Sequence, residues 1–512
     1  MKNEFLKKFE YKILNHIEIK KKYSGIKNKS IILCHGVFDI VHPGHIRHLI
    51  YAKSKSDILV VSITSDKFIE KGKYRPHVPQ SLRALNLAAF EMVDHVIIDN
   101  NKTPMNLIKS LKPKFFAKGF EYSSKIPKST IEEKKLVESH GGQMLFTPGD
   151  IVYSSSKLLN EKQPNLSIEK LSLLMSNHKI TFDLIKKTID KFKNFHVHVF
   201  GDTIIDTYTR TSFIGGQTKT PTFSVLYDKH EDYLGGAGIV SKHLRAAGAK
   251  VDFTTVLGQD DFAKFVKKDL KKNKINLNLI TDPTRPTTNK NVIINGNYRL
   301  LKLDKLDNRP VSQEIQKEFS KYLKNINADA VILSDFRHGI FNKDSIPSYL
   351  KSIPKKMFKV ADSQVASRWG NITEFKNFDL ITPNERESRF ALADQDSTVS
   401  SLADSLVEVA NCKNLILKLS ERGVFCLEKN KNKKSFFTLD SFAKQVVDSV
   451  GSGDALLAYS TLSFLVSNSI VIASIIGSIA AACECEFDGN IPIKKEIVIR
   501  KINELEKEIN FL

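Results

Sequence analysis

Short apolar runs alternate with segments of helical periodicity along the first third of the chain. Residues 31–34 and 58–63 are continuous apolar runs, the pattern of strands buried on both faces in a parallel sheet. Residues 82–92 have the spacing of a helix. Further short strands are predicted at 96–98, 115–117 and 144–146. Strands that alternate with helices predict a parallel sheet with helices on both of its faces.

The same alternation resumes after residue 195. Apolar runs predict strands at 197–200, 331–334, 358–361, 380–382 and 415–419. Residues 292–303 form a hairpin by composition, with Asn295-Gly296-Asn297 as the turn, and 239–247 read as a helix. The pattern therefore predicts a second α/β domain.

The intervening segment separates these two regions. From residue 163 onward the chain is rich in Lys, has helical periodicity and contains no predicted strand before residue 196. We expect an α/β protein with a first domain at 1–162, a linker at 163–181 and a second domain at 182–512. A chain of 512 residues is too long for one core, which agrees with this division.

Residues 455–485 are almost uncharged and invite comparison with a membrane span. Ser467-Asn468-Ser469 interrupts the run, and the small residues Gly477, Ala480 and Ala481 are typical of helices packed inside a protein. We therefore expect buried helices and no membrane span.

Charge and cysteine usage narrow the classes of partner and compartment. The formal net charge is +21, but the lysines are spread along the chain and form no basic block with interleaved aromatics. This favours anionic small-molecule substrates over nucleic acid. Five cysteines, an odd number, and a charged N-terminus without an apolar core indicate a cytoplasmic protein. The oligomeric state stays open, a homodimer included.

Candidate chemistry begins directly after the first apolar run. Two histidines, His42 and His45, flank Gly44 where the strand gives way to a helix. A helix that starts there directs free N–H groups and its positive dipole end at a ligand, which favours phosphate. Imidazoles at that point can donate to phosphate oxygens.

This segment resembles the cytidylyltransferase-like nucleotidyltransferases. Their Gly-x-Phe-Asp-x-x-His-x-Gly-His signature is complete here as Gly36, Phe38, Asp39, His42, Gly44 and His45. The resemblance implies a Rossmann-like nucleotidyltransferase domain in which His42 and His45 stabilise the transferring phosphate.

Later residues extend the resemblance to the bifunctional heptose kinase/adenylyltransferases, which make ADP-heptose for lipopolysaccharide. Weaker candidates for phosphate contacts stand at predicted strand ends and loops: Lys71, Arg83, Lys118, Ser154 and Ser155. The family implies that a sugar 1-phosphate attacks the α-phosphorus of a nucleoside triphosphate and displaces pyrophosphate, with Mg²⁺.

A second phosphate-handling segment lies in the last quarter of the chain. Asp448-Ser449-Val450-Gly451-Ser452-Gly453-Asp454 runs directly into the apolar helix. The Gly451, Ser452 and Gly453 N–H groups suit phosphate, and Asp454 can accept the proton of an attacking hydroxyl.

This half resembles the ribokinase-like (PfkB) carbohydrate kinases, which implies an α/β/α domain with a small β lid. Ser449 and Ser452 stand where the family pattern has Thr and Ala. Asn384-x-x-Glu387 matches an element associated with Mg²⁺ and phosphate, with Glu387 acting on the metal indirectly. Lys418 and Gly423 are further nucleotide-site candidates, and the sugar-site candidates are Asp202, Asp206, Gly235, Gly236 and Asp335.

Two features depart from the heptose enzymes. Ile239 stands where those kinases carry an Asn that contacts the sugar, and an apolar side chain cannot make that hydrogen bond. The domain order is also reversed, with the transferase first.

We predict a bifunctional enzyme of nucleotide-sugar synthesis that uses ATP and Mg²⁺. One domain would phosphorylate a heptose-like sugar or sugar phosphate, and the other would join a sugar 1-phosphate to a nucleotide from ATP or CTP. The alternatives are a CTP-dependent transferase acting on a polyol phosphate or phosphonate, and a chain in which one domain is catalytically silent.

Overall fold

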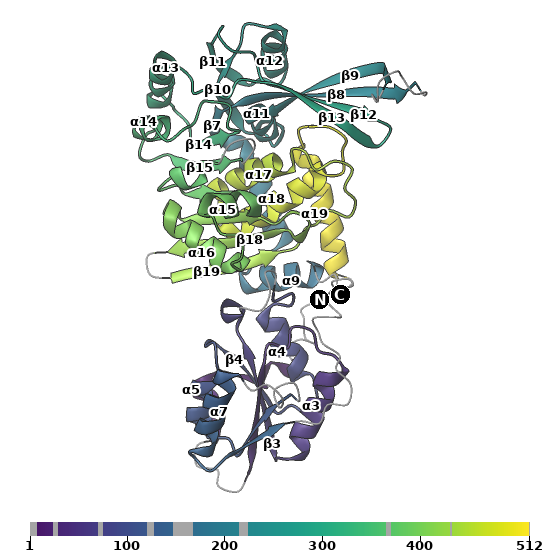
Figure 1. Ribbon diagram of the computed structural model, residues 1–512, viewed down its shortest axis with the longest axis vertical. Helices are drawn as coiled ribbons and strands as arrows, with labels where there is room; N and C mark the ends of the chain where they lie inside the picture. The colour runs from purple at the N-terminus through teal and green to yellow at the C-terminus, as the bar shows by residue number, and fades with distance from the viewer. Residues whose placement is uncertain are drawn as a thin grey trace. The chain divides into compact units, whose positions relative to one another are not determined.

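The structure is a computed structural model that describes residues 8–23, 29–69, 75–119, 127–146, 167–214, 224–364, 370–430 and 433–510. The chain divides into two compact units, Met1–Leu166 and Ser167–Leu512 (Figure 1). Each unit has its own sheet and its own hydrophobic core, so each is described by itself.

The first unit is built on a six-stranded parallel sheet in the order β1-β4-β3-β2-β5-β6. Its strands are β1 (Ile13–Leu14), β2 (Ile31–Gly36), β3 (Ile58–Thr64), β4 (His95–Asp99), β5 (Phe115–Lys118) and β6 (Gln143–Phe146). Its helices are α2 (His16–Tyr23), α3 (Pro43–Ser54), α4 (Gln80–Ala88), α5 (Met105–Leu111) and α7 (Lys128–Glu138).

Helices cover both faces of this sheet. Leu49 of α3 and Leu87 of α4 pack in one core cluster, while Leu107 of α5 and Val137 of α7 pack in the other. The strands β2 and β3 pack on both sides, which is why they are apolar without alternation. The predicted parallel sheet is confirmed.

The second unit contains a nine-stranded sheet in the order β11-β10-β7-β14-β15-β16-β17-β18-β19. All pairs are parallel except those of β18 with β17 and β19. The strands are β7 (His196–Gly201), β10 (Lys250–Leu257), β11 (Asn276–Thr281), β14 (Ala330–Asp335), β15 (Phe358–Ser363), β16 (Leu380–Ile381), β17 (Asn414–Lys418), β18 (Val424–Asn430) and β19 (Lys433–Leu439).

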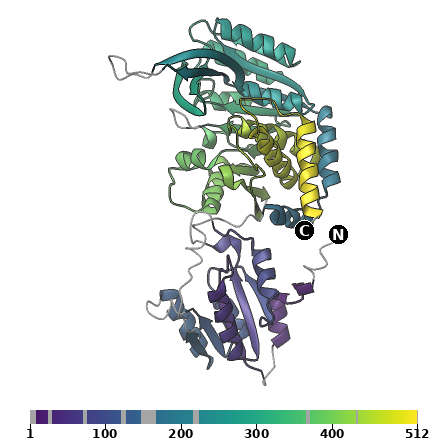
Figure 2. The ribbon, with the colours of Figure 1, turned by 90° about the vertical axis from the view of Figure 1, so that its right-hand side faces the viewer.

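Helices form a layer on each face of this sheet and give the α/β/α arrangement (Figures 1 and 2). One core cluster includes side chains of α9 (Ser167–Asn177), α10 (Phe182–Asp190), α11 (Ala237–Ala246), α12 (Asp261–Lys272), α17 (Ser452–Ser467), α18 (Ile470–Glu484) and α19 (Lys495–Asn510). The other includes side chains of α13 (Gln313–Lys324), α14 (Ser345–Ser352), α15 (Glu385–Leu392) and α16 (Val399–Ala410).

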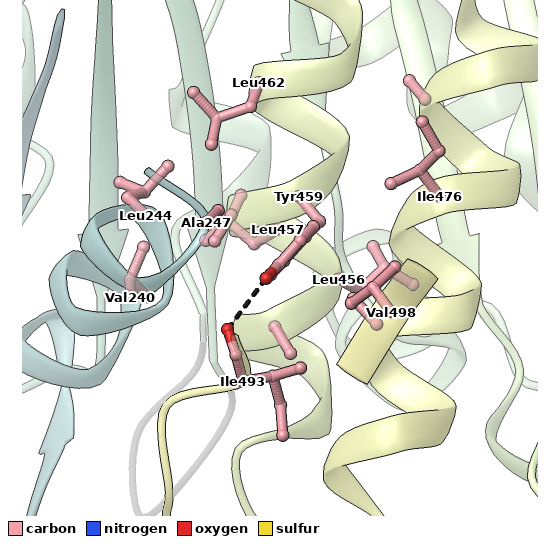
Figure 3. Close-up of a cluster of buried hydrophobic side chains, with 14 of the residues drawn as sticks. Val240, Leu244, Ala247, Leu456, Leu457, Tyr459, Leu462, Ile476, Ile493 and Val498 are labelled. Atoms are coloured by element: carbon pink, nitrogen blue, oxygen red, sulfur yellow. Dashed lines mark hydrogen bonds between the residues drawn. The ribbon is translucent and has the colours of Figure 1, made fainter. Parts of the chain in front are cut away.

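The uncharged run 455–485 forms the two central helices α17 and α18. Asn468, in the left-handed conformation, ends α17, and Ser469 caps the start of α18. Figure 3 shows α17 between its neighbours, with the buried Tyr459 hydroxyl donating to the Ile493 carbonyl at 2.8 Å. Among the described residues, no helix has both the length and the apolar character that a bilayer crossing demands.

A separate four-stranded sheet, the lid sheet, projects from this unit (Figure 1). Its order is β13-β12-β8-β9, with β8 (Thr203–Phe213), β9 (Val225–Gly236), β12 (Asn289–Asn295) and β13 (Tyr298–Lys305). The predicted hairpin is β12 and β13. Sequence reasoning missed β8 and β9, because polar residues fill much of both strands and hide their extended pattern.

The segment predicted as a linker contains a packed helix. Within α9, Leu171, Leu174 and Met175 are buried in the core of the second unit. The apolar positions of this Lys-rich stretch therefore act as core residues rather than as part of a free connection.

Candidate functional site

The first candidate site lies at the carboxyl end of β2, where α3 begins. His42 is the N-cap of α3, and its Nδ1 accepts a hydrogen bond from the Gly44 N–H at 3.1 Å. The His42 and His45 rings stack with centroids 3.9 Å apart. The structure thus places both predicted histidines together at a helix N-terminus, the arrangement that suits a phosphate.

His45 is held as a neutral imidazole. Burial, helped by the nearby His42 and His48, lowers the pKa of His45 to about 4. At neutral pH it can therefore act as a hydrogen-bond donor or acceptor rather than as a fixed cation. Negative charge brought by a triphosphate would favour its protonation.

The rest of the signature shapes the loop around these histidines. Phe38 has a φ of +49°, and its ring lies where it would be 3.1 Å from a Cβ on Gly36. One oxygen of the buried Asp39 accepts from the N–H groups of His77 and Val78 at 2.8 and 2.9 Å. The contacts of Gly36, Phe38 and Asp39 are with other parts of the protein. These residues therefore shape the loop around the histidines rather than bind a ligand themselves.

Arg83 does not act as the phosphate contact that its position suggested. It is fully buried and donates to the carbonyls of Val37, Val78 and Thr64. It also pairs with Asp66 at 2.6 Å. A guanidinium with four such acceptors has little left for a ligand, so Arg83 clamps the signature loop to β3.

Lys118 lies at the end of β5 and is nearly buried. Its ammonium is 2.8 Å from the Glu133 carboxylate of α7. Three other candidates of this domain, Lys71, Ser154 and Ser155, lie outside the described residues.

The second candidate site is a cavity of about 780 Å³ in the second unit. Its lining includes most of the predicted kinase residues: Asp206, Gly236, Asn384, Glu387, Lys418, Gly423, Gly451, Ser452, Gly453 and Asp454. These residues come from the lid sheet, from carboxyl ends of the large sheet and from the start of α17. Parallel α/β sheets bind ligands at that edge.

Asp454 lies in a cluster of buried charges. The Lys418 ammonium is 3.1 Å from both oxygens of Asp362, and Glu387 lines the same cavity. Burial and the Asp362 carboxylate raise the pKa of Asp454 well above its usual value. Although burial opposes its charge, Asp362 and Glu387 raise the pKa of Lys418. The arrangement poises one carboxyl group for proton transfer beside a fixed cation.

The segment 448–454, which we call the phosphate turn, has the backbone shape of an anion site. Gly451 has a φ of +87°, and a Cβ there would lie 2.3 Å from the Asn490 Oδ1. A Cβ on Gly453 would lie 3.3 Å from the Lys418 ammonium. Glycine at 451 therefore permits both the conformation and the close approach of Asn490.

Asn384 and Glu387 form a capping box at the start of α15. The Asn384 Oδ1 accepts from the Glu387 N–H at 2.8 Å, and Glu387 accepts from the Asn384 N–H at 2.6 Å. Burial raises the pKa of Glu387 to about 7. The Asn-x-x-Glu element thus fixes a helix start while it leaves one acid at the cavity wall.

The five sugar-site candidates divide into two groups. Asp206 lines the cavity, and a Cβ on Gly235 would lie 2.1 Å from its Oδ2. Asp202, by contrast, is buried and accepts from the N–H groups of Phe336 and His338. Asp335 accepts from Ser363 and Asn371. Asp202 and Asp335 therefore hold loops together, and neither is among the residues that line the cavity.

Several cavity residues escaped sequence reasoning. Lys290, Arg299 and Lys302 of the lid hairpin line the cavity, as does Asp362 at the end of β15. The sequence indicated the hairpin that carries Lys290, Arg299 and Lys302, but residues 298–305 show no regular alternation of polar and apolar positions that would tell which side chains face a ligand. Ile239, which seemed to weaken the sugar site, is fully buried in α11 and is not among the lining residues.

Comparison with known proteins finds a family model for each of the two domains. Residues 194–495 match the family model described as pfkB family carbohydrate kinase, which is more than half of the chain. The chain belongs to the pfkB family of carbohydrate kinases. Residues 33–161 match the cytidylyltransferase-like model, so the pfkB domain follows a cytidylyltransferase-like domain.

Relatives with the name bifunctional protein HldE match this pfkB protein. That of Aliarcobacter butzleri is 29% identical over 287 residues, 55% of this chain and 58% of the relative. That of Helicobacter pylori HPAG1 is 29% identical over 299 residues, 56% of this chain and 61% of the relative. The chain thus matches about three fifths of the length of these relatives.

Solved structures support the pfkB fold. Phosphofructokinase-2 from Escherichia coli in complex with substrates and products aligns with a TM-score of 0.51 at 13% identity. The alignment covers 61% of this chain and 99% of that one. At this identity the likeness concerns the fold alone.

Proposed function

We propose that the second domain transfers the γ-phosphoryl group of ATP to a hydroxyl of a heptose-like sugar or sugar phosphate. The observation that carries this proposal is Asp454, at the start of α17, next to the phosphate turn and Lys418 in one cavity. The acceptor hydroxyl gives its proton to Asp454, while the N–H groups at 451–453 receive the γ-phosphate charge.

The charges on the lid favour a phosphorylated acceptor. Lys290 and Lys302 line the cavity on the same lid hairpin as Arg299. Burial and Lys302 lower the pKa of Lys290, although the charges of nearby aspartates oppose this, so a further anion would stabilise its charged form. An anionic group on the acceptor would supply this anion. Asp206 is the carboxylate for sugar hydroxyls.

The apolar part of the cavity lining fits a nucleoside. It contains small and apolar side chains, with Val424, Ala443 and Val446 among them, and the Gly423 turn. An apolar slot beside a phosphate turn suits the base of ATP.

The residues present fit Mg²⁺ that arrives with the nucleotide. In such sites one or two carboxylates assist, and phosphates and waters supply the remaining ligands. Among the described residues, no group of three or more His, Cys, Asp and Glu side chains is arranged to hold a metal alone. Asp362 and Glu387 would hold the ion, directly or through its waters, and the ion would neutralise phosphate charge.

For the first domain we propose nucleotidyl transfer from a nucleoside triphosphate to a sugar 1-phosphate. The stacked pair of His42 and His45 at the N-terminus of α3 supports this proposal. The imidazoles and the positive dipole end of α3 would hold the α-phosphate as the sugar phosphate attacks and pyrophosphate leaves.

Two assays on the full chain test the two halves. Purified protein is incubated with MgATP and a panel of heptoses and heptose phosphates, and with ATP or CTP and sugar 1-phosphates; mass spectrometry identifies the products. We expect phosphorylated sugar from the first assay and nucleotide-sugar plus pyrophosphate from the second. Absence of pyrophosphate with every donor and acceptor would refute the transferase proposal.

A further inference from the structure

The carboxylate that opens the phosphate turn is held from outside the turn. Asp448 is buried, and its Oδ2 accepts from the Tyr208 hydroxyl at 2.6 Å. Its Oδ1 lies 2.9 Å from the Arg299 guanidinium. Tyr208 belongs to β8 and Arg299 to β13, so two strands of the lid sheet converge on one side chain.

The same carboxylate also shapes the turn from within. The Val450 N–H donates to the Asp448 Oδ1 at 3.2 Å, directly before the glycine with positive φ. A shift of Asp448 would therefore move the N–H groups that receive the γ-phosphate. Groups that stabilise transferred phosphate must be placed before the reaction to be effective.

The two lid strands that hold Asp448 also carry side chains that line the cavity. Tyr208 lies on the same strand as Asp206, and Arg299 on the same strand as Lys302, and all four line the cavity. The Arg299 guanidinium also lies over the Tyr208 ring, 5.6 Å from its centre. Asn490 adds a second connection, because its amide nitrogen lies 3.3 Å from Asp206 while its Oδ1 faces Gly451.

We propose that Tyr208 and Arg299 are positioning residues that set the phosphate turn through Asp448 when the lid sheet lies over the cavity. This inference rests on the proposed kinase reaction. In this arrangement the phosphate turn is fully formed only while the lid groups that bind the acceptor lie in the cavity. Water does not bind the lid groups, so it does not stabilise the lid over the cavity. A phosphate turn that depends on the lid therefore disfavours transfer of the phosphoryl group to water.

Steady-state kinetics of Tyr208→Phe, Asp448→Asn and the double variant tests this latch. We expect Tyr208→Phe to lower kcat about tenfold, the factor that corresponds to one hydrogen bond to a charged group, with the acceptor KM changed less than about twofold. In the Asp448→Asn background the same change should have little further effect, because Tyr208 acts through that carboxylate. Arg299→Gln should behave like Tyr208→Phe.

The matched controls are Tyr298→Phe and Lys305→Gln, which alter exposed positions of β13 and should leave kcat unchanged. Losses that multiply in the double variant would overturn the latch, as would a rise in the acceptor KM with kcat unchanged, which indicates direct contact with substrate.

Hydrogen exchange provides a readout that does not depend on activity. The amides of residues 450–454 should exchange faster in Tyr208→Phe than in the unmodified protein or in Tyr298→Phe. Equal exchange in all three proteins would refute the latch even if no sugar is phosphorylated. Faster exchange without kinase activity would instead support the latch and refute the proposed function.

Discussion

At the scale of single residues, the electrostatics of Asp454 govern how the kinase site should respond to pH. The base must lose its proton before it can accept one from the acceptor hydroxyl. Burial and the Asp362 carboxylate raise the pKa of Asp454, so the fraction in the active form rises with pH over a range above that of an ordinary aspartate. Lys418 opposes this shift.

The pH profile of kcat/KM for phosphorylation therefore has an acid limb that Asp362 controls. Asp362→Asn removes a negative charge near Asp454, so the limb should move to lower pH, although the maximal rate falls because Lys418 loses its partner. Asp440→Asn, which breaks the pair with Lys170 and alters a side chain that does not line the cavity, serves as the control and should leave the limb in place. A limb that stays fixed in Asp362→Asn would mean that another group titrates.

Residue identity predicted the positions of the candidate side chains better than it predicted their contacts. His42, His45, Asp206 and Asp454 lie where their motifs indicated. Arg83 and Asp202 are candidates for the same two sites, but the structure shows them buried against backbone groups. A polar residue at a strand end can bind a ligand or hold a loop, and its neighbours in space determine which of the two it does.

At the scale of elements, apolar continuity identified β2 to β6 of the first unit and β7, β14, β15, β16 and β17 of the second, while β1, β10, β11, β18 and β19 of the large sheets were missed. The polar strands of the lid sheet, β8 and β9, were missed as well. Thr207, Thr209 and Thr211 of β8 are buried, yet hydrogen bonds rather than apolar packing satisfy them, as in the bond from Thr209 to Asn291. Such strands carry no hydrophobic signal to read. The lid sheet could therefore be predicted only in part, from its β12–β13 hairpin.

The central helix α17 offers a direct test of where the stability of the second domain lies. Leu457 of α17 is fully buried in the core cluster that also contains Leu244 of α11 and Ala247, and Figure 3 draws it beside Ala247. Leu457→Ala should lower the free energy of unfolding by about 2–5 kcal/mol, since it leaves a cavity in a packed core. Val409→Ala, on the half-exposed face of α16, should cost less than about 1 kcal/mol. Chemical denaturation followed by circular dichroism measures both.

At the scale of the whole molecule, the two units have separate sheets and separate cores. Each candidate site is built from residues of one unit alone. Nothing in the described contacts of either site requires the other domain for its shape.

The two activities should therefore be separable by single substitutions in the full chain. We expect His45→Ala to abolish nucleotidyl transfer and to leave sugar phosphorylation within about twofold of the unmodified protein. We expect Asp454→Asn to lower sugar phosphorylation by at least about a hundredfold and to leave nucleotidyl transfer within about twofold. Loss of both activities from either substitution, with the melting temperature unchanged, would show that the sites are coupled.

The crowded acids around Lys418 have a consequence for the lifetime of the protein. The Lys418 ammonium is the shared cation of three buried acids, Asp362, Glu387 and Asp454. This excess of buried negative charge favours binding of a ligand that brings positive charge. A metal-bound nucleotide binds only the folded form and so shifts the folding equilibrium by mass action. Differential scanning fluorimetry should show a melting temperature that rises by several degrees with saturating MgADP and less with ADP alone. The abundance of nucleotide would then set how often this domain opens to proteolysis, independently of any catalysis.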